Sequence, residues 1–271
     1  MKPAKIYPLW WNPWGDQGLD FDCTVSISID NLTYDKDADY KILFLAEPLA
    51  ILPTVSEGAL KNAYKFDKIY TFTQSILDKY PTAELFEWGS SWLDFKDLKI
   101  AKKNNVSFVT SNKSQSVGHQ LRLQINDMLK RVDVSNGLQY YSHLSPPFHQ
   151  RRNDFFESPK FHIAAENSRQ KNYFTEKIID CFASKTVPIY YGCPNLGDWF
   201  HMDGVITFQD LDELELIIKK LDADAYDWRK DAIEHNYEIA KKFHSDNDVV
   251  PRLTRKIMEE VNNATARIQS N

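Results

Sequence analysis

The sequence predicts an α/β fold in which two domains are each built around a parallel sheet. The chain has 271 residues, which is long for one domain and short for three. Short apolar runs alternate with segments of helical periodicity in both halves, a pattern typical of parallel sheets with crossover helices. A hydrophobic content of 42% and a charged content of 26% are ordinary for a globular protein with a sizeable core.

The first half of the chain contains the shorter elements. Residues 1–20 carry tryptophans among prolines and glycines, so we expect an irregular, packed segment there. Predicted strands follow at 21–29, 40–46, 68–72 and 83–88, and predicted helices at 57–66 and 75–80. The charged stretch 92–105 is predicted to be a linker. We therefore expect an N-terminal domain of residues 1–100 and a C-terminal domain of residues 101–271 that includes the last helices.

One carboxylate in this half lies where a ligand site is expected. Glu47 follows the apolar run 40–46, and open α/β sheets build their ligand crevice beyond the carboxyl ends of buried strands. The alternative is that Glu47 only marks the exit of the strand into solvent. Its position alone favours that alternative.

The second half repeats the alternation more clearly. Predicted strands lie at 106–112, 161–165, 187–191 and 205–208, and predicted helices at 175–184, 212–221, 226–243 and 250–268. A further helix with Ser116 as its N-cap is indicated by an apolar stripe at Leu121, Ile125, Met128, Leu129 and Val132. A loop is expected between this helix and the strand at 161. Arg122 lies beside the stripe, either as an exposed solubilising residue or as a cation directed into a cleft.

Several functional classes are disfavoured by composition. The net charge is -5, whereas nucleic-acid-binding proteins usually carry a basic stripe. Cys23, Cys181 and Cys193 are scattered, so we expect neither a metal site nor a disulfide framework. No apolar run reaches the roughly 18 residues of a membrane span, and the N-terminus lacks the apolar core of a signal peptide. We therefore expect no nucleic-acid partner, no transmembrane segment and a cytoplasmic location.

A dense polar loop lies within the stretch Phe161–Phe200. It contains Glu166, Asn167, Tyr173, Glu176 and Lys177. The helix predicted to begin at Thr175 offers free backbone N–H groups and the positive end of its dipole to an anion. Lys177 in the first turn opposes that dipole, so its position costs helix stability unless an anion compensates. The loop therefore indicates an anion site, and the competing interpretation is a capped helix with Glu176 and Lys177 as surface charges.

Neighbouring helix positions point about 100° apart, so we expect Glu176 and Lys177 to contact different groups.

Other chemical motifs are weaker or missing. The sequence has no GxGxxG, GxxxxGK[ST], GxSxG or HExxH motif. DxD-like groups occur at 20/22, 35/37/39 and 222/224, but they precede a strand or lie in polar segments. Solvated loops explain them better than a metal site does.

The polar loop and its flanks closely resemble the signature of the family 10 glycosyltransferases, the α-1,3/α-1,4-fucosyltransferases. The family pattern is present as FHIAAENS, NYFTEK, KTVPIYYGCPN and DWF, in order and with similar spacing. Departures are Asn172 where Asp is common, Lys185 where Gly is common, and His201 where Pro often follows. SFVTSNKSQSVGHQLRLQINDML is similar to the family segment whose helix bears a donor-binding Arg, here Arg122. ILFLAEP is similar to the strand that ends in the catalytic Glu, here Glu47.

The resemblance implies a GT-B fold with two Rossmann-like domains facing a central cleft. It implies an inverting, metal-independent transfer of fucose from GDP-fucose to a hydroxyl of an oligosaccharide acceptor, with no cofactor. Glu47 is then the catalytic base, and the donor-binding residues are Arg122, Asn167, Tyr173, Glu176 and Lys177. The N-terminal domain is expected on the acceptor side and the C-terminal domain on the donor side. The chain is similar to the minimal catalytic core of bacterial or viral members, without the membrane anchor and stem of the Golgi enzymes.

Two other functions share parts of this pattern. The first keeps the fold and the site but uses another GDP-sugar, because no residue shows a preference for a 6-deoxy sugar. The second is a catalytically idle carbohydrate-binding protein that uses the aromatic N-terminal segment. The seven tryptophans fit either core packing or a surface on which sugar rings stack.

Overall fold

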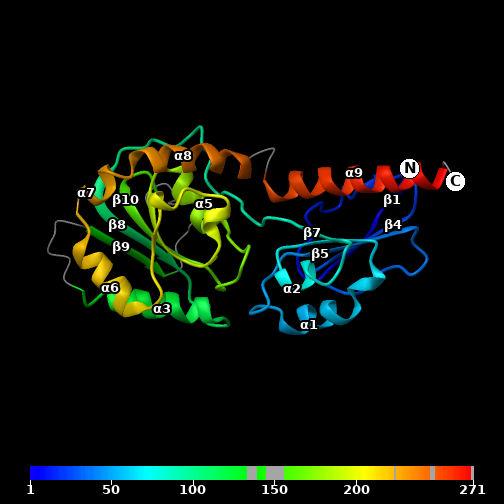
Figure 1. Ribbon diagram of the computed structural model, residues 1–271, viewed down its shortest axis with the longest axis horizontal. Coiled ribbons are helices and arrows are strands. Elements are labelled where there is room, and N and C mark those ends of the chain that lie inside the picture. The colour runs from blue at the N-terminus through cyan, green and yellow to red at the C-terminus, as the bar shows by residue number, and fades with distance from the viewer. Residues whose placement is uncertain (133–138, 145–155, 223, 245–247, 270–271) are drawn as a thin grey trace. The chain divides into compact units, whose positions relative to one another are not determined.

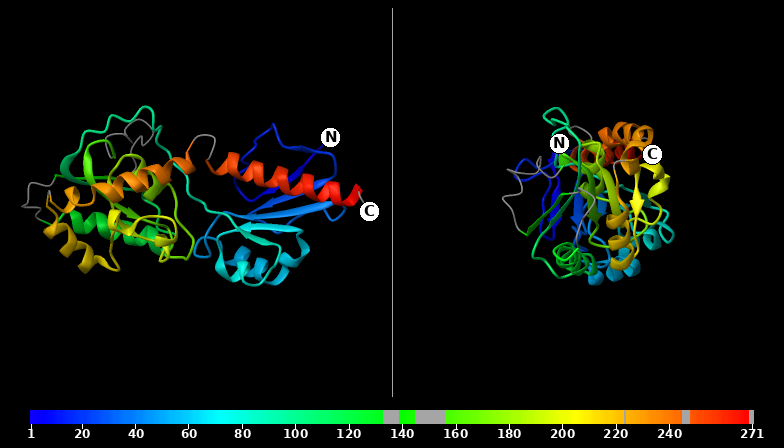
Figure 2. Two further views of the ribbon diagram at one scale, coloured as in Figure 1. Left: turned by 45° about the horizontal axis from the view of Figure 1, so that its top comes forward. Right: turned by 90° about the vertical axis from the view of Figure 1, so that its left-hand side faces the viewer.

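A computed structural model describes residues 1–132, 139–144, 156–222, 224–244 and 248–269 (Figures 1 and 2). The chain divides into two compact units. The N-terminal unit combines Met1–Trp88 with Lys171–Tyr173 and Asp246–Asn271, and the C-terminal unit combines Gly89–Gln170 with Phe174–Ser245. No helix among the described residues is both long enough and apolar enough to span a membrane.

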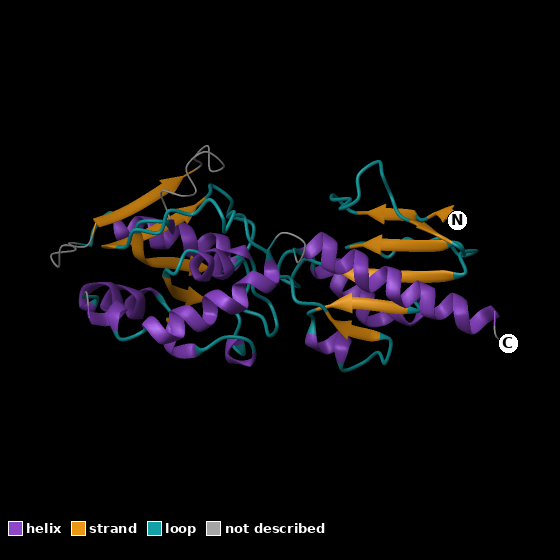
Figure 3. Cartoon of the chain, turned by 90° about the horizontal axis from the view of Figure 1, so that it is seen from above, coloured by secondary structure: helices purple, strands orange, loops and turns teal. Residues whose placement is uncertain are grey.

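The N-terminal unit is built on a parallel five-stranded sheet in the order β2-β4-β5-β6-β7 (Figure 3). Its strands are β2 (Lys5–Pro8), β4 (Val25–Ile29), β5 (Tyr40–Leu45), β6 (Lys68–Thr71) and β7 (Ala83–Leu85). The short strands β1 (Lys2–Pro3) and β3 (Asp20–Phe21) pair antiparallel in a separate two-stranded sheet. Both faces of the sheet are buried, which is why β5 appears in the sequence as a continuous apolar run.

Helices cover the two faces of this sheet. Leu43 and Leu45 of β5 pack in one cluster with α1 (Pro53–Asn62), the 3-10 turn η1 (Ala63–Lys65) and α2 (Gln74–Leu77). Ile42 and Phe44 point to the other face, where they pack with α9 (Val249–Gln269) (Figure 1). The residues of α9 in that cluster repeat every four positions: Val249, Leu253, Ile257 and Val261.

The C-terminal unit has a second parallel five-stranded sheet, in the order β12-β11-β10-β8-β9. Its strands are β8 (Lys103–Thr110), β9 (Gln139–Leu144), β10 (Pro159–Ala165), β11 (Val187–Tyr191) and β12 (Ile206–Thr207). On one face, Phe161 and Ile163 pack with α3 (Val117–Leu129) and α6 (Leu211–Lys220). On the other, Ala164 packs with α5 (Glu176–Ala183) and α8 (Lys230–Ala240) (Figure 1). Short helical turns complete the unit: η2 (Leu196–Asp198), η3 (Met202–Gly204), α7 (Asp224–Asp227) and η4 (Lys241–Phe243).

The strand order of the C-terminal unit reverses between β8 and β10. From β8 the chain adds β9 on one side, and it then returns to add β10, β11 and β12 on the other side. The connections that leave the carboxyl ends of β8 and β10 therefore diverge to opposite faces, and α3 and α5 begin there. Such a switch point is where open α/β sheets bind their ligands.

Most of the predicted strands and helices are present with ends that differ by a few residues, and five differences are larger. β1 and β2 lie in a segment expected to be irregular, and β9 lies in an expected loop. The helix expected at 226–243 is broken into α7, α8 and η4. The last helix packs on the N-terminal sheet, whereas the sequence assigned it to the C-terminal domain. The division between units falls at Trp88 rather than near residue 100, because Leu93 and Phe95 pack in the C-terminal core.

Candidate functional site

The start of α3 lies against the segment that follows β10. The N–H of Gly118 donates to the carbonyl of Asn167 at 3.3 Å. A Cβ atom at Gly118 would lie 2.1 Å from the carbonyl oxygen of Glu166, so a side chain cannot be accommodated without moving backbone. Glycine is needed at this position because it allows the close approach of two backbones.

A reciprocal cap fixes the first turn of α3. Ser116 Oγ accepts from the N–H of His119 at 3.1 Å, and His119 Nδ1 accepts from the N–H of Ser116 at 3.2 Å. The predicted N-cap is therefore confirmed. Burial, Arg122, Lys113 and Lys177 together lower the pKa of His119 to about 4, so this ring is neutral at pH 7. The two cations of the predicted site both lie close enough to act on one imidazole.

Arg122 is a buried residue with a fixed head group. Its side chain is 6% exposed, and its Nη1 donates to the carbonyl of Ala165 and to Oδ1 of Asn167, both at 2.9 Å. Both acceptors lie at the carboxyl end of β10. Of the two alternatives that the sequence left open, the exposed solubilising residue is wrong, and Arg122 holds a cation at the switch point.

Glu166 joins the end of β10 to the start of α5. This fully buried carboxylate accepts the N–H of Thr175 at 2.9 Å and its hydroxyl at 2.8 Å. Burial raises the pKa of Glu166, although Lys177 and the two bonds from Thr175 oppose the rise. Thr175 is also the N-cap of α5, as predicted, since its Oγ1 accepts from the N–H of Lys177. Glu166 therefore fixes the entry to α5.

Lys177 and Glu176 contact one another at the first turn of α5. Lys177 Nζ lies 2.8 Å from Glu176 Oε1, 3.1 Å from Thr175 Oγ1 and 3.7 Å from Glu166 Oε2. Lys177 and Glu176 thus contact each other, because the long lysine stem folds back over the helix start, and their contact with different ligand groups stays a prediction. Burial acts to raise the pKa of Glu176, but Lys177 and the bonds from Thr175 outweigh it, and the net pKa is lowered. Lys177 remains 23% exposed at its side chain, so its ammonium is within reach of solvent.

Tyr173 and its neighbour Asn172 belong to the N-terminal unit. Tyr173 is 2% exposed, and its ring packs on Phe72 with centroids 4.9 Å apart. Asn172 donates through Nδ2 to Gln74 Oε1 at 3.0 Å and to the carbonyl of Phe72 at 3.4 Å. Its φ is +65°, a left-handed conformation that Asn and Asp tolerate better than most residues. Tyr173 is thus packed within the N-terminal unit, whereas the other predicted donor residues belong to the C-terminal unit.

Glu47 lies just beyond β5 in the N-terminal unit and is half-buried. Its backbone N–H donates to Oδ1 of Asp30 at 3.1 Å, and the N–H of Ala46 donates to the same oxygen at 2.8 Å. Asp30 ends the adjacent strand β4 with a φ of +48° and is only 3% exposed. Burial raises the pKa of Asp30 to about 6, although the two N–H bonds oppose the rise. Asp30 therefore fixes the backbone that carries Glu47.

The structure brings four of the six predicted site residues together. Arg122, Asn167, Glu176 and Lys177 lie where β10 ends and α5 begins, with the buried Glu166 beneath them. Sequence reasoning missed the structural roles of Glu166, Gly118 and Asp30. Glu166 stood in the polar loop and in the ENS motif, which was the available signal. Gly118 and Asp30 act through contacts with distant segments and leave no local pattern.

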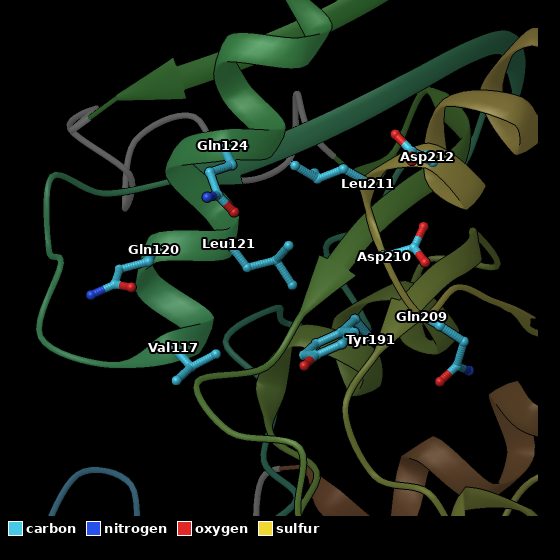
Figure 4. Close-up of a pocket in the computed structure, with 9 residues that line it drawn as sticks. All are labelled: Val117, Gln120, Leu121, Gln124, Tyr191, Gln209, Asp210, Leu211 and Asp212. Carbon is cyan, nitrogen blue, oxygen red and sulfur yellow. The ribbon is translucent and has the colours of Figure 1, made fainter.

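A separate hollow of about 390 Å³ opens on the α3 and α6 side of the C-terminal unit (Figure 4). Its lining residues are Val117, Gln120, Leu121, Gln124, Tyr191, Gln209, Asp210, Leu211 and Asp212. None of the predicted donor residues lines it, so we place the candidate site at the switch point. Among the described residues, no group of three His, Cys, Asp or Glu side chains is arranged to hold a metal ion.

Comparison with known proteins decides the family. The model for glycosyltransferase family 10 (fucosyltransferase), C-terminal part, matches residues 99–268, which is more than half of the chain. The chain belongs to glycosyltransferase family 10. The resemblance drawn from the four sequence motifs is thereby confirmed.

Curated family 10 proteins match over shorter stretches. An α-(1,3)-fucosyltransferase of Helicobacter pylori is 30% identical over 123 residues, which are 44% of this chain and 25% of that protein. An α-(1,4)-fucosyltransferase of Arabidopsis thaliana is 36% identical over 87 residues, 29% of this chain and 22% of that protein. The matched stretches thus span about a quarter of these relatives.

Solved structures support the fold. An α1,3-fucosyltransferase crystallised with GDP is similar with a TM-score of 0.52 and 16% identity, over 87% of this chain and 82% of that one. The form crystallised with GDP-fucose gives a TM-score of 0.51 with the same identity and coverage. The predicted α/β fold class of GT-B type is therefore confirmed.

Proposed function

We propose that this family 10 protein is an inverting fucosyltransferase that moves fucose from GDP-fucose to a hydroxyl of a glycan acceptor. One observation carries the proposal. Arg122 and Lys177 are both held where β10 ends, beside the start of α5, which is where a departing diphosphate needs positive charge. Relatives and solved structures named as fucosyltransferases, two of the latter with GDP or GDP-fucose, support the same donor.

The leaving group is stabilised by the C-terminal unit. Negative charge grows on the diphosphate as the bond to the sugar breaks, and fixed cations stabilise that charge without reorganising. Arg122 is preorganised by its two bonds to the end of β10. The start of α5 adds the positive end of a helix dipole. The proposed roles of Asn167 and Glu176 are to orient Arg122 and to contact the sugar.

The ion pair between Lys177 and Glu176 explains how a lysine is tolerated in a first helical turn. In the structure the ammonium lies 2.8 Å from a carboxylate oxygen of Glu176 and 3.7 Å from one of Glu166. A bound diphosphate supplies the alternative anion, and Glu176 is then released toward the sugar hydroxyls. Lys177 thus has a partner in both states, and helix stability is preserved.

Glu47 is the proposed base. It takes the proton from the acceptor hydroxyl as that oxygen forms a bond to the anomeric carbon and the bond to the diphosphate breaks. Attack from the face opposite the leaving group inverts the configuration. Asp30 holds the backbone of Glu47 through two N–H bonds, and this fixes the carboxylate that must meet the hydroxyl. The N-terminal unit is accordingly proposed to serve the acceptor and the C-terminal unit the donor.

The proposal is tested by following GDP release from GDP-fucose with and without a panel of glycans. Acceptor-stimulated GDP release together with a fucosylated product of inverted configuration is the expected result. Faster release from GDP-mannose would assign another donor, and glycan binding without any turnover would assign a binding protein. We expect turnover to persist in EDTA, and strict dependence on a divalent ion would overturn the metal-independent mechanism.

We further propose that the protein works in a reducing compartment, as in the cytoplasm. All three cysteines are free thiols, and two of them, Cys181 and Cys193, are buried. Fractionation of the source cells, with thiol labelling of the denatured protein, tests the location. Recovery with the secreted fraction would contradict it.

A further inference from the structure

We propose that Trp10 and Trp11 form a stacking subsite for a pyranose ring of the acceptor glycan. The inference deepens the proposed function and rests on it, because it takes the ligand of this edge to be the glycan whose hydroxyl meets Glu47. It assigns a sugar-binding role to an N-terminal segment that the mechanism does not use. The argument has three parts: the position of the segment, the exposure of its rings and the chemistry of its neighbours.

The sheet register places this segment at the same edge as Glu47. Pro8, Ile29 and Phe44 are level in the parallel strands β2, β4 and β5. Beyond them, the N–H of Leu9 donates to the carbonyl of Ile29 at 3.0 Å, and Asp30 is bonded to the residues that follow β5. Neighbouring strands lie about 5 Å apart, so the ends of β2 and β5 are roughly 10 Å apart across Asp30. Residues 9–11 and Glu47 therefore leave the sheet close to one another.

The rings are uncovered in the structure. Trp10 is 61% exposed and Trp11 is 37% exposed, and the flanking Leu9 and the Leu49 beyond Glu47 are 42% and 46% exposed. Tryptophan is highly buried on average, and a group of exposed apolar side chains at one edge marks a binding surface. Trp11 is nevertheless held in place, because its ring packs edge-to-face with that of Trp88, with the centroids 5.9 Å apart. This platform is anchored to the sheet before any ligand arrives.

The neighbouring carboxylate selects the class of ligand. An apolar protein partner that covered these rings would also bury Glu47, and burial of an unpaired carboxylate is costly. A pyranose can cover the rings and also hydrogen-bond to the carboxylate of Glu47. The C–H groups of one sugar face carry slight positive charge and are attracted to the negative face of an indole ring. The hydroxyl groups at the rim donate hydrogen bonds to a carboxylate.

Substitutions at two tryptophans of nearly equal exposure separate this role from a general effect of losing a tryptophan. Trp10→Ala removes the proposed platform, and Trp228→Ala removes a ring that is 60% exposed in the C-terminal unit. Trp10→Phe restores a stacking ring. Trp10 is largely solvent-exposed, so these substitutions leave the core intact. The full chain is titrated with lactose, cellobiose and chitobiose by calorimetry, and the acceptor KM is measured for whichever of them is fucosylated.

We expect Trp10→Ala to weaken disaccharide binding and raise the acceptor KM about tenfold. Trp10→Phe should recover most of the loss, Trp228→Ala should match the wild type, and the KM for GDP-fucose should not change. Equal affinities for Trp10→Ala and Trp228→Ala, or no binding of any disaccharide by the wild type, would overturn the inference. Failure of the proposed function has a different signature: GDP does not bind and no GDP is released, while Trp10→Ala still loses disaccharide binding. The tryptophans would then be a glycan subsite of a protein that is not a fucosyltransferase.

Discussion

The carboxyl edges of the two sheets differ in where their residues come from in the chain and in how exposed those residues are. In the C-terminal unit the charged groups come from one short stretch and from α3. They are largely buried, and each cation has a fixed partner within the group. In the N-terminal unit the corresponding edge is assembled from the ends of three strands. Asp30 accepts two backbone hydrogen bonds there, beside one half-buried carboxylate, and two tryptophan rings are exposed.

The difference follows from what each edge binds in the proposed mechanism. A diphosphate is small and strongly charged, so it is best met by a few cations held rigidly by backbone acceptors. A glycan acceptor is broad and uncharged. It is better met by ring faces and hydrogen-bonding groups spread over several loops. The two edges should accordingly fail in different ways when they are altered.

The largest loss is expected from Glu47→Gln. Removing the proposed base should lower the rate of transfer by about 10²–10⁴-fold, because proton transfer from the acceptor is lost. Affinity for GDP, measured by calorimetry, should stay unchanged because Arg122 and Lys177, the proposed diphosphate contacts, lie in the other unit. Glu57→Gln, at an exposed position of α1, serves as the matched control. Full activity in Glu47→Gln would remove Glu47 from the mechanism.

The next largest losses are expected from Arg122→Ala and Lys177→Ala. Each variant removes one preorganised cation, so we expect about a 10²–10³-fold lower rate and weaker binding of GDP. Lys130→Ala is the control, since that lysine is exposed and pairs with Asp127 at 2.9 Å. Calorimetry with GDP distinguishes the cases directly. If GDP binds equally to all three variants, neither cation contacts the diphosphate.

A smaller effect is expected from Gly118→Ala. The added methyl group meets the carbonyl of Glu166, so the backbone at the switch point must shift. We expect a cost of about 1–3 kcal/mol in unfolding free energy and weaker GDP binding. Gly197→Ala is the control, because there the nearest atom belongs to the flexible side chain of Met202 at 3.3 Å. Equal stability of the two variants in urea denaturation would show that the close approach is not needed.

The smallest effect concerns pH and the N-terminal edge. The pKa of Asp30 is about 6 in the folded state against a usual value of 3.8, so between these values Asp30 binds more protons in the folded chain than in the unfolded chain. The contribution of Asp30 to the free energy of unfolding therefore falls as the pH rises from about 4 to about 6. Asp30→Asn removes this contribution while keeping an oxygen that can accept both N–H bonds. Denaturation of both proteins at about pH 4 and about pH 7 should show the variant gaining stability relative to the wild type as the pH rises. A constant difference would mean that Asp30 titrates normally.

Much of the candidate site at the carboxyl edge of the C-terminal sheet could be predicted from the sequence, because its groups are close together in the chain. Asn167, Glu176 and Lys177 lie within eleven positions, and Thr175 marks the helix start by an ordinary capping preference. The pairing of Lys177 with Glu176 was missed because helical angles describe where a stem leaves the helix and not where a long lysine side chain ends. Lys185, which departs from the family pattern, adopts a φ of +56°, which explains why glycine is common at that position.

The carboxyl edge of the N-terminal sheet was harder to predict, because its residues become neighbours only when the strands pair. Asp30 and Glu47 are seventeen residues apart and become neighbours because β4 and β5 pair in parallel. The sequence predicted a helix at 250–268, and in the structure its apolar positions repeat every four residues on one buried face. The prediction carried no information on which of two sheets that face would cover. Tyr173 likewise stands in a motif of the C-terminal unit and packs on Phe72, a contact that no local pattern indicates.

The position of α9 has a consequence for how the protein is made. Along the chain, the strands of the N-terminal sheet are synthesised before the C-terminal unit, and the helix that covers one of their faces is synthesised after it. At a synthesis rate of about 5–20 residues per second, the apolar face around Ile42 and Phe44 waits for roughly ten seconds or more for its cover. The nascent chain thus exposes this apolar surface for most of its synthesis. This interval is when a chaperone would be most useful.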